Sequence, residues 1–201
     1  MLSIANPEYW ENRYQEGTTR WDLGQAAPPL QSLLNSPQAP RPGKIAVLGC
    51  GRGYDAILFA QHGFEAIGFD FASSAIADAT ALAQASGSSA KFMQRDIFEL
   101  PAEFPHEFDY VLEHTCFCAI DPSLRSAYVK LARNILRSQG ELIGLFWAHT
   151  RPGGPPFGAT IEEVQQLFAP DFNILSLELV TNSIPERQGD EYLGHFRFKG
   201  S

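Results

Sequence analysis

Basic residues are scarce in this 201-residue chain, which has 15 lysines and arginines against 23 aspartates and glutamates. A formal net charge of -8 would repel a phosphate backbone from any surface that lacks a local basic patch. We therefore expect no nucleic acid among its partners.

Long apolar runs are missing as well. No stretch approaches the roughly 20 apolar residues that span a bilayer. The N-terminus MLSIANPEYW has neither the basic nor the apolar region of a secretory signal. These absences predict a cytoplasmic protein that has no membrane partner.

Cysteine is rare, with three residues at positions 50, 116 and 118. Their spacing matches no zinc pattern, and the last two are too close in sequence for an easy disulfide. The five histidines show no ligand-like spacing either. We expect free thiols and no metal ion.

Low-complexity tracts and internal repeats are absent, and 44% hydrophobic with 19% charged residues is an ordinary globular composition. The length suits one domain. We expect a monomer or a weak homodimer. We expect an N-terminal helical lid over residues 1–36. A proline-rich connector then leads to a Rossmann-like core over residues 44–201.

Strand and helix patterns alternate along the core, which is typical of a parallel sheet flanked by helices. The second helix begins at Ser73, whose side chain is available as an N-cap. The expected strands are 44–48, 64–69, 90–94, 108–112 and 141–147, and the expected helices are 55–62, 73–85 and 122–136.

Two further strands, 173–181 and 191–199, follow a helix over 161–168 with no long helix between them, which indicates an antiparallel edge hairpin. Before the core, 6–17 and 21–34 are helical in part. The prediction is an α/β, Rossmann-like fold with a mostly parallel seven-stranded sheet.

Glycines at 49, 51 and 53 follow the first strand directly, where a missing Cβ lets the backbone approach a ligand. Asp70 ends the next strand, 19 residues after Gly51, at the spacing of a carboxylate that binds ribose hydroxyls. Nicotinamide dehydrogenases share this pattern. The G-x-G-x-G order and Asp96 after the third strand favour a different adenosine cofactor, although Asp96 also suits a simple turn.

These residues resemble class I S-adenosylmethionine-dependent methyltransferases, and further segments narrow the resemblance. The chain is similar to the thiopurine S-methyltransferase superfamily, and within it to the halide, thiol and thiocyanate branch related to the plant "harmless to ozone layer" proteins. The segments that carry it, besides the glycine loop, are PEYWENRYQEGTTRWDLG, FDYVLEHTCFCAIDPSLR, GELIGLF, GGPPF and IPERQGDEYLG.

The resemblance implies roles for individual residues. Trp10, Tyr14 and Trp21 would form a lid over the cofactor, which Gly49 and Gly51 in the glycine loop would also contact. Asp70 would bind the ribose. Asp96 and Ile97 would bracket the adenine, and His114, after the fourth strand, would close the site.

The acceptor would face His114, Cys116, Phe117, Arg125 and Phe157. His114 could serve as a base, although an orienting or adenine-stacking role is the alternative. Arg125 could attract an anionic acceptor or form an ordinary ion pair on a helix surface. Glu113 stays ambiguous.

The resemblance implies methyl transfer from S-adenosylmethionine to a small soft nucleophile such as a thiol, hydrosulfide, thiocyanate or halide. Three alternatives stay open: a methyltransferase for another small molecule, a cofactor-binding module without catalysis, and a nicotinamide-dependent oxidoreductase.

Overall fold

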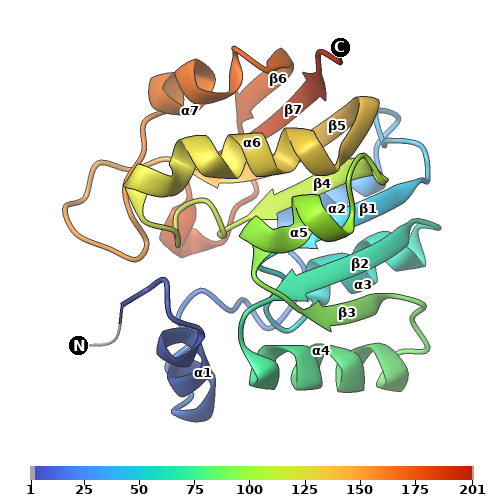
Figure 1. Cartoon of the computed structure of the whole chain (residues 1–201), viewed down its shortest axis with the longest axis vertical. Helices are drawn as coiled ribbons and strands as arrows, with labels where there is room; N and C mark the ends of the chain where they lie inside the picture. Colours follow the sequence, from blue (N-terminus) through green and yellow to red (C-terminus); the bar gives the residue numbers. More distant parts are fainter. Residues whose placement is uncertain (1–2, 201) are drawn as a thin grey trace.

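The computed structural model describes residues 3–200 and contains a seven-stranded sheet in the order β3-β2-β1-β4-β5-β7-β6 (Figure 1). The strands are β1 (Lys44–Leu48), β2 (Glu65–Asp70), β3 (Lys91–Gln94), β4 (Phe108–His114), β5 (Leu136–Trp147), β6 (Phe172–Leu179) and β7 (Glu191–Phe198). The first five pair in parallel, while β7 runs antiparallel to β5 and β6. The predicted fold class is confirmed.

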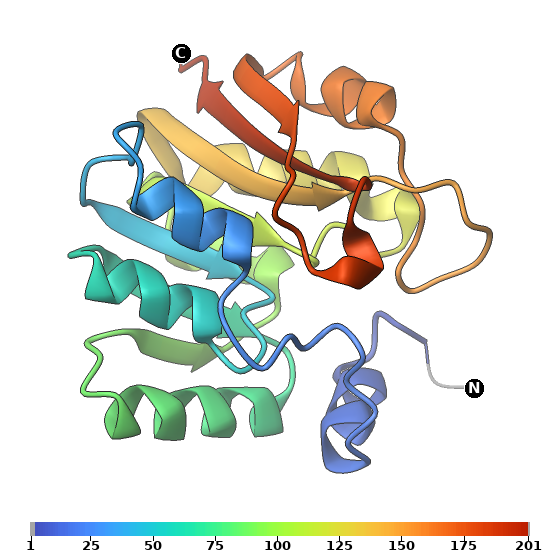
Figure 2. The same cartoon turned by 180° about the vertical axis from the view of Figure 1, so that it is seen from behind.

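Helices cover both faces of the sheet, with α5, α6 and α7 on one face and α2 and α3 on the other (Figures 1 and 2). The helices are α1 (Pro7–Gln15), α2 (Pro28–Leu34), α3 (Tyr54–Gln61), α4 (Ser73–Ala85), α5 (Leu100–Glu103), α6 (Arg125–Ile135) and α7 (Ile161–Phe168). Short 3-10 turns are η1 (Ile97–Glu99), η2 (Pro122–Leu124) and η3 (Pro185–Arg187).

Alternate side chains of β1 enter two separate apolar clusters. Ala46 and Leu48 pack in the cluster that contains α6 and α7 residues, and Ile45 and Val47 pack with α2 and α3. Successive side chains of a strand point to opposite faces, so a strand with apolar residues at every position is buried on both sides.

The predicted lid of residues 1–36 is too long at its C-terminal end. Leu30 and Leu34 of α2 are buried in the same cluster as Ile45 and Phe59, so α2 belongs to the cover of the sheet. We use "lid segment" below for residues 3–24; residues 1 and 2 of the prediction lie outside the described chain.

The start of β5 also differs from the prediction. Leu136 already pairs with Phe108, and the next paired residues are Tyr110 and Glu141. Residues 137–140 therefore form a bulge. Their sequence, RSQG, does not follow the pattern of a regular strand, so the expected strand begins at Glu141. Among residues 3–200, no helix is long and apolar enough to cross a bilayer.

The carboxyl ends of the parallel strands lie at one edge of the sheet. The helix α1, the long segment between β5 and α7, and the turn η3 come together at the same edge (Figures 1 and 2). In open α/β sheets this is the edge where ligands bind.

Candidate functional site

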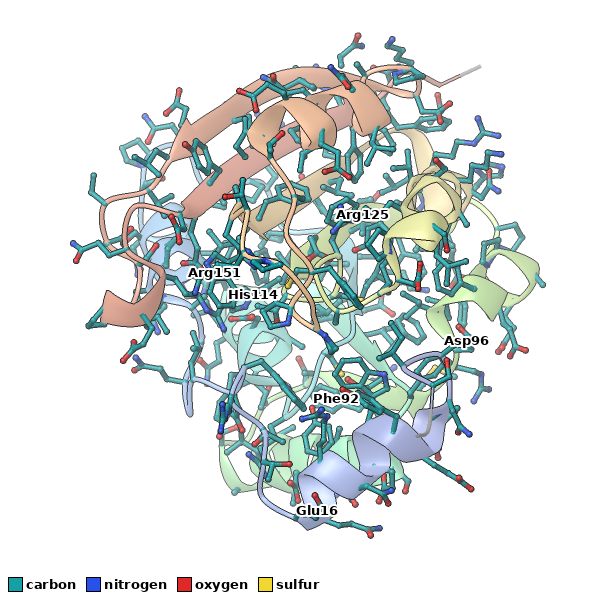
Figure 3. All side chains as sticks on the ribbon, turned by 90° about the vertical axis from the view of Figure 1, so that its left-hand side faces the viewer. Glu16, Phe92, Asp96, His114, Arg125 and Arg151 are labelled. Carbon is teal, nitrogen blue, oxygen red and sulfur yellow. The ribbon has the colours of Figure 1, made fainter. Side chains whose placement is uncertain are left out.

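A cavity of about 1360 Å³ opens at the carboxyl ends of the strands, on the side of the molecule that faces the viewer in Figure 3. Its walls come from the lid segment, the turns after β1 to β4, the segment after β5, and η3. The predicted cofactor residues that line it are Trp10, Tyr14, Trp21, Gly49, Asp70, Asp96 and Ile97. Gly51 and His114 were also predicted to contact the cofactor, but they are not among the residues that line the cavity.

The turn after β1 depends on its glycines. Gly49, Gly51 and Gly53 have φ angles of 58°, 52° and 78°, a region that glycine enters without the steric cost of a Cβ. A Cβ on Gly49 would lie 2.9 Å from Cys116 Sγ. The backbone of Gly49 can thus form the cavity wall, while the N–H of Gly51 turns away to donate to Asp70 Oδ2 at 2.9 Å.

Two backbone N–H groups fix the carboxylate of Asp70. Oδ2 accepts from Gly51 at 2.9 Å and Oδ1 accepts from Ala72 at 3.0 Å. Burial raises the pKa of this carboxyl, and the bonds from Ala72 and Gly51 oppose the shift. Each carboxylate oxygen has two lone-pair sites, so both oxygens can still accept from a ligand.

Asp96 lies after β3. It caps a turn and also lines the cavity. Its Oδ1 accepts from the N–H of Phe98 at 2.9 Å and caps η1. Ile97, 7% exposed, lies beside it in the cavity wall. An acidic and an apolar side chain are therefore adjacent where the sequence predicts the adenine.

The lid aromatics pack against one another edge to face. Ring centroids are 5.5 Å apart for Trp10 and Trp21 and 5.8 Å apart for Tyr14 and Trp21, and Trp21 Nε1 donates to the Tyr14 hydroxyl at 3.4 Å. Burial raises the pKa of Tyr14, with the charge of Asp70 as the next cause. The lid thus presents neutral rings to the cavity.

Glu11 attaches α1 to the start of α4. Its carboxylate accepts from the backbone N–H of Ser74 at 3.0 Å and from the hydroxyls of Ser73 and Ser74. Ser73 is therefore not the N-cap of α4; Ala72 occupies that position without a side-chain bond. The backbone bond from Ser74 is the largest cause that lowers the pKa of Glu11, to about 2.

Arg52 makes a second attachment of the lid segment. Its guanidinium pairs with Asp78 on α4 at 3.0 Å and with Asp22 in the lid segment. No local sequence pattern marks Glu11 or Arg52, because their partners are distant in sequence.

His114 does not occupy the predicted position. Its Nδ1 lies 2.7 Å from Asp55 Oδ2 and its Nε2 lies 3.1 Å from Arg187 Nη1. Arginine can only donate, so Nε2 accepts and Nδ1 carries the hydrogen. Because both ring nitrogens are occupied and His114 is not among the cavity residues, the expectations of a base and of an adenine-stacking ring are corrected.

Arg125 is buried away from the cavity, which corrects its predicted contact with the acceptor. It is 2% exposed and pairs with Glu163 at 2.6 Å. Its Nη2 donates to the carbonyls of Phe157 and Gly158 at 3.3 and 2.9 Å. The arginine therefore holds the end of the segment that contains the GGPP sequence.

Phe117 and Phe157 are also not among the residues that line the cavity. Phe117 is 3% exposed in the core, where its N–H donates to Glu113 at 2.9 Å. Tyr128 also donates to this carboxyl, and burial raises the pKa of Glu113 to about 7. Glu113 is therefore a buried structural group.

Cys116 and Cys118 are buried and line the cavity. All three cysteines are free thiols, as predicted. Burial raises the pKa of Cys116, and it raises that of Cys118 to about 12. Both thiols stay protonated near neutral pH and make poor nucleophiles.

Arg187 in η3 lines the cavity, and the sequence marks it only as part of the segment IPERQGDEYLG. It is 3% exposed, pairs with Glu191 at 3.1 Å and donates to the carbonyl of Trp21 at 3.2 Å. Its guanidinium lies 4.8 Å from the ring centroid of Trp147. Arg187 thus connects the C-terminal hairpin to His114 and to the lid segment.

Comparison with known proteins finds matches over nearly the whole chain. The family model for thiopurine S-methyltransferase (TPMT) matches residues 5–199. Thiocyanate methyltransferase 1 of Arabidopsis thaliana is 34% identical over 196 residues, which cover 94% of this chain and 83% of that protein. "Probable thiol methyltransferase 2" of the same plant is 31% identical over 204 residues, covering 98% and 88%.

A solved structure supports the fold independently. The 1,6-didemethyltoxoflavin-N1-methyltransferase of Burkholderia thailandensis, with S-adenosylhomocysteine bound, superposes with a TM-score of 0.77 at 22% identity. The match covers 98% of this chain and 88% of that one.

Proposed function

This chain belongs to the thiopurine S-methyltransferase family and is an S-adenosylmethionine-dependent methyltransferase, and from this premise we propose that it methylates a small soft nucleophile: a thiol, hydrosulfide, thiocyanate or a halide. The observation that carries the proposal is the relatedness, over nearly the whole chain, to plant proteins named for thiocyanate and thiol methylation.

The residues around the cavity fit the cofactor. Asp70 ends β2 with both oxygens able to accept from ribose hydroxyls. Asp96 and Ile97 offer an acceptor and an apolar surface for the adenine, and the backbone of Gly49 leaves room beside them. We assign these residues to cofactor binding. The role of Gly51 is indirect, because its N–H positions Asp70.

The lid segment would cover the sulfur end of the cofactor. Bound S-adenosylmethionine supplies a methyl group activated by a positively charged sulfur. Trp10, Tyr14 and Trp21 line the cavity with aromatic surfaces, each of which stabilises a nearby cation by about 0.5–2 kcal/mol. Packed against one another, they also exclude water from the reacting atoms.

Replacing Glu11 by glutamine tests how the lid is attached. The variant should bind S-adenosylhomocysteine about twofold to fivefold more weakly in calorimetry, because a solvent-screened helix cap contributes about 0.5–1 kcal/mol. The lowered pKa of Glu11 means that its contribution is complete above about 4.5 and is lost as the pH falls toward about 2.

The matched control for this test is Glu8→Gln. Glu8 lies in the first turn of the same helix and is exposed, so the charge change is identical. Equal affinities of the Glu11 variant, the Glu8 variant and the unchanged protein would show that the contact with α4 does not hold the lid.

The state of three ionisable groups at the site supports the proposed acceptor class. His114 has both ring nitrogens engaged, and burial keeps the thiols of Cys116 and Cys118 protonated. An acceptor that already carries a reactive lone pair needs no base. Thiocyanate, halides and the thiolate forms of thiols, whose ordinary pKa is near 8.5, meet this condition at about neutral pH.

Positioning is then the main task of the protein, and it can supply on the order of 7–11 kcal/mol of barrier reduction. The bound cofactor would supply the methyl group, and the residues around the cavity would place the acceptor's lone pair in line with it. Gly154, Pro155 and Pro156 border the cavity. By holding the carbonyls of Phe157 and Gly158, Arg125 acts as a positioning residue for this segment.

A mass-spectrometric screen of acceptors tests the proposed function. We expect methylated products from hydrosulfide or a small aromatic thiol and from thiocyanate, and a higher kcat/KM for iodide than for chloride. Soft anions give up their hydration at a lower cost than hard oxyanions do. Carboxylates, protein and nucleic acid should give no product.

Two results would contradict the proposal. Efficient methylation of an oxygen or nitrogen acceptor, with none of a thiol or halide, would assign the protein to another small molecule. Tight binding of S-adenosylhomocysteine without turnover of any acceptor would favour a module that binds the cofactor and performs no catalysis.

A further inference from the structure

Two N–H groups at the end of β5 are buried and have no hydrogen-bond partner among residues 3–200. They are the indole Nε1 of Trp147 and the imidazole Nε2 of His149. Both residues line the cavity, and His149 is 8% exposed. Buried polar groups in folded proteins nearly always have a partner, since an unpaired one costs free energy. These two donors therefore need an acceptor that the described residues do not supply.

The ligand must accept hydrogen bonds from both groups. An indole Nε1 can only donate. The backbone N–H of Arg151 donates to His149 Nδ1 at 3.3 Å, so the ring hydrogen of a neutral His149 lies on Nε2. Burial, and next the charge of Arg151, lower the pKa of His149, which favours the neutral ring. The rings of Trp147 and His149 are 5.1 Å apart between centroids.

Two arginines flank the Trp147 ring beside these donors. The guanidinium of Arg187 lies 4.8 Å from the centroid of the Trp147 ring, and that of Arg151 lies 5.0 Å from it. Their acidic partners are Glu191 and Asp190, each at 3.1 Å. An anion that enters would meet N–H donors beside two arginines whose charge is already balanced by carboxylates. Such surroundings carry little net positive charge, which suits a weakly hydrated monovalent anion better than a multiply charged one. Figure 3 labels Arg151 at this edge of the molecule.

We propose that Trp147 Nε1 and His149 Nε2 form a subsite for the acceptor as a small, weakly hydrated monovalent anion such as thiocyanate, hydrosulfide or iodide. This inference rests on the proposed function and adds the atoms that bind the acceptor. The neighbouring wall contains Ile120, Pro155 and Pro156. Apolar groups of this kind leave a strongly hydrated anion without compensation for its lost water, so the subsite selects soft anions.

The test is a titration of the protein saturated with S-adenosylhomocysteine, followed by the indole N–H signals in a ¹H–¹⁵N correlation spectrum. The chain has three tryptophans and thus three such signals, and Trp147→Phe identifies one by its loss. Thiocyanate should move the Trp147 signal in a saturable manner. The signal of Trp10, whose Nε1 donates to the Ile4 carbonyl, should stay, and sulfate at equal ionic strength should move neither.

Kinetics provide a second readout with a matched pair of variants. Trp147→Phe should raise the KM for thiocyanate about tenfold or more and change the affinity for S-adenosylhomocysteine less than twofold. Trp10→Phe should weaken the binding of S-adenosylhomocysteine and leave the KM for thiocyanate nearly unchanged, because Trp10 belongs to the lid. Melting temperatures within a few degrees of the unchanged protein confirm that both variants fold.

The outcomes separate the subsite from the proposed function. A saturable shift of the Trp147 signal without methylation of any anion would leave the subsite and refute the function. Turnover of thiocyanate with an unmoved Trp147 signal would support the proposed function and refute the subsite. A shift seen only in cofactor-free protein would mean that bound S-adenosylhomocysteine blocks the donors. They would then belong to the carboxylate of the cofactor, and the acceptor subsite would be overturned.

Discussion

Replacing Asp70 by alanine is expected to weaken binding of S-adenosylhomocysteine by about 1.5–3 kcal/mol, the range for hydrogen bonds to a charged group. Asp70 lines the cavity with both oxygens available beyond their bonds to Gly51 and Ala72. Calorimetry measures the loss, which corresponds to about tenfold to 150-fold in Kd.

The carboxylate also holds two backbone N–H groups, so a second variant separates binding from loop geometry. Asp70→Asn keeps one acceptor oxygen and should lose less stability than the alanine variant, while still binding weakly. Asp171→Ala is the control, because its ion pair with Arg133 involves no cavity residue. An alanine variant that folds and binds with unchanged affinity would refute the ribose assignment.

Deletion of residues 1–24 should leave a folded sheet domain that binds the cofactor poorly. The deletion removes Trp10, Tyr14 and Trp21 from the cavity wall. Since each contact between an aromatic ring and a cation contributes about 0.5–2 kcal/mol, the total loss should be about 2 kcal/mol or more. The remaining Leu30 and Leu34 keep α2 packed on the sheet, so the melting transition should stay cooperative.

The comparison of two ligands sharpens this test. S-adenosylmethionine carries the positive sulfur and S-adenosylhomocysteine does not, so the deletion should weaken binding of the first more than that of the second. In the intact protein, tryptophan fluorescence should change when either ligand is added. Equal affinity of the truncated and full-length chains would show that the lid segment does not cover the cofactor.

The predicted site residues that line the cavity include several that lie close to a strand end. Gly49 and Asp70 follow neighbouring strands, and strands that pair in parallel place their carboxyl ends together. The bond between Gly51 and Asp70 is a consequence of that local geometry. Asp96 follows from the same argument, since β3 is the next strand of the sheet.

The residues that were predicted wrongly or missed depend on partners far along the chain. His114 is the last residue of β4, but Asp55 and Arg187, 59 and 73 residues away, engage its ring. Glu11 replaces Ser73 as the group that caps α4 from 63 residues away. A local pattern contains no information about such pairs.

The sequence by itself determined the sheet, the glycine turn and the acidic residues at the strand ends, because hydrophobic periodicity and short spacings act within one βαβ unit. Only the tertiary structure decided that Arg125 holds a loop, that His114 is engaged, and that Trp147 and His149 have free donors. Burial and hydrogen-bond partners arise when distant segments pack together, and they set the chemistry of each side chain.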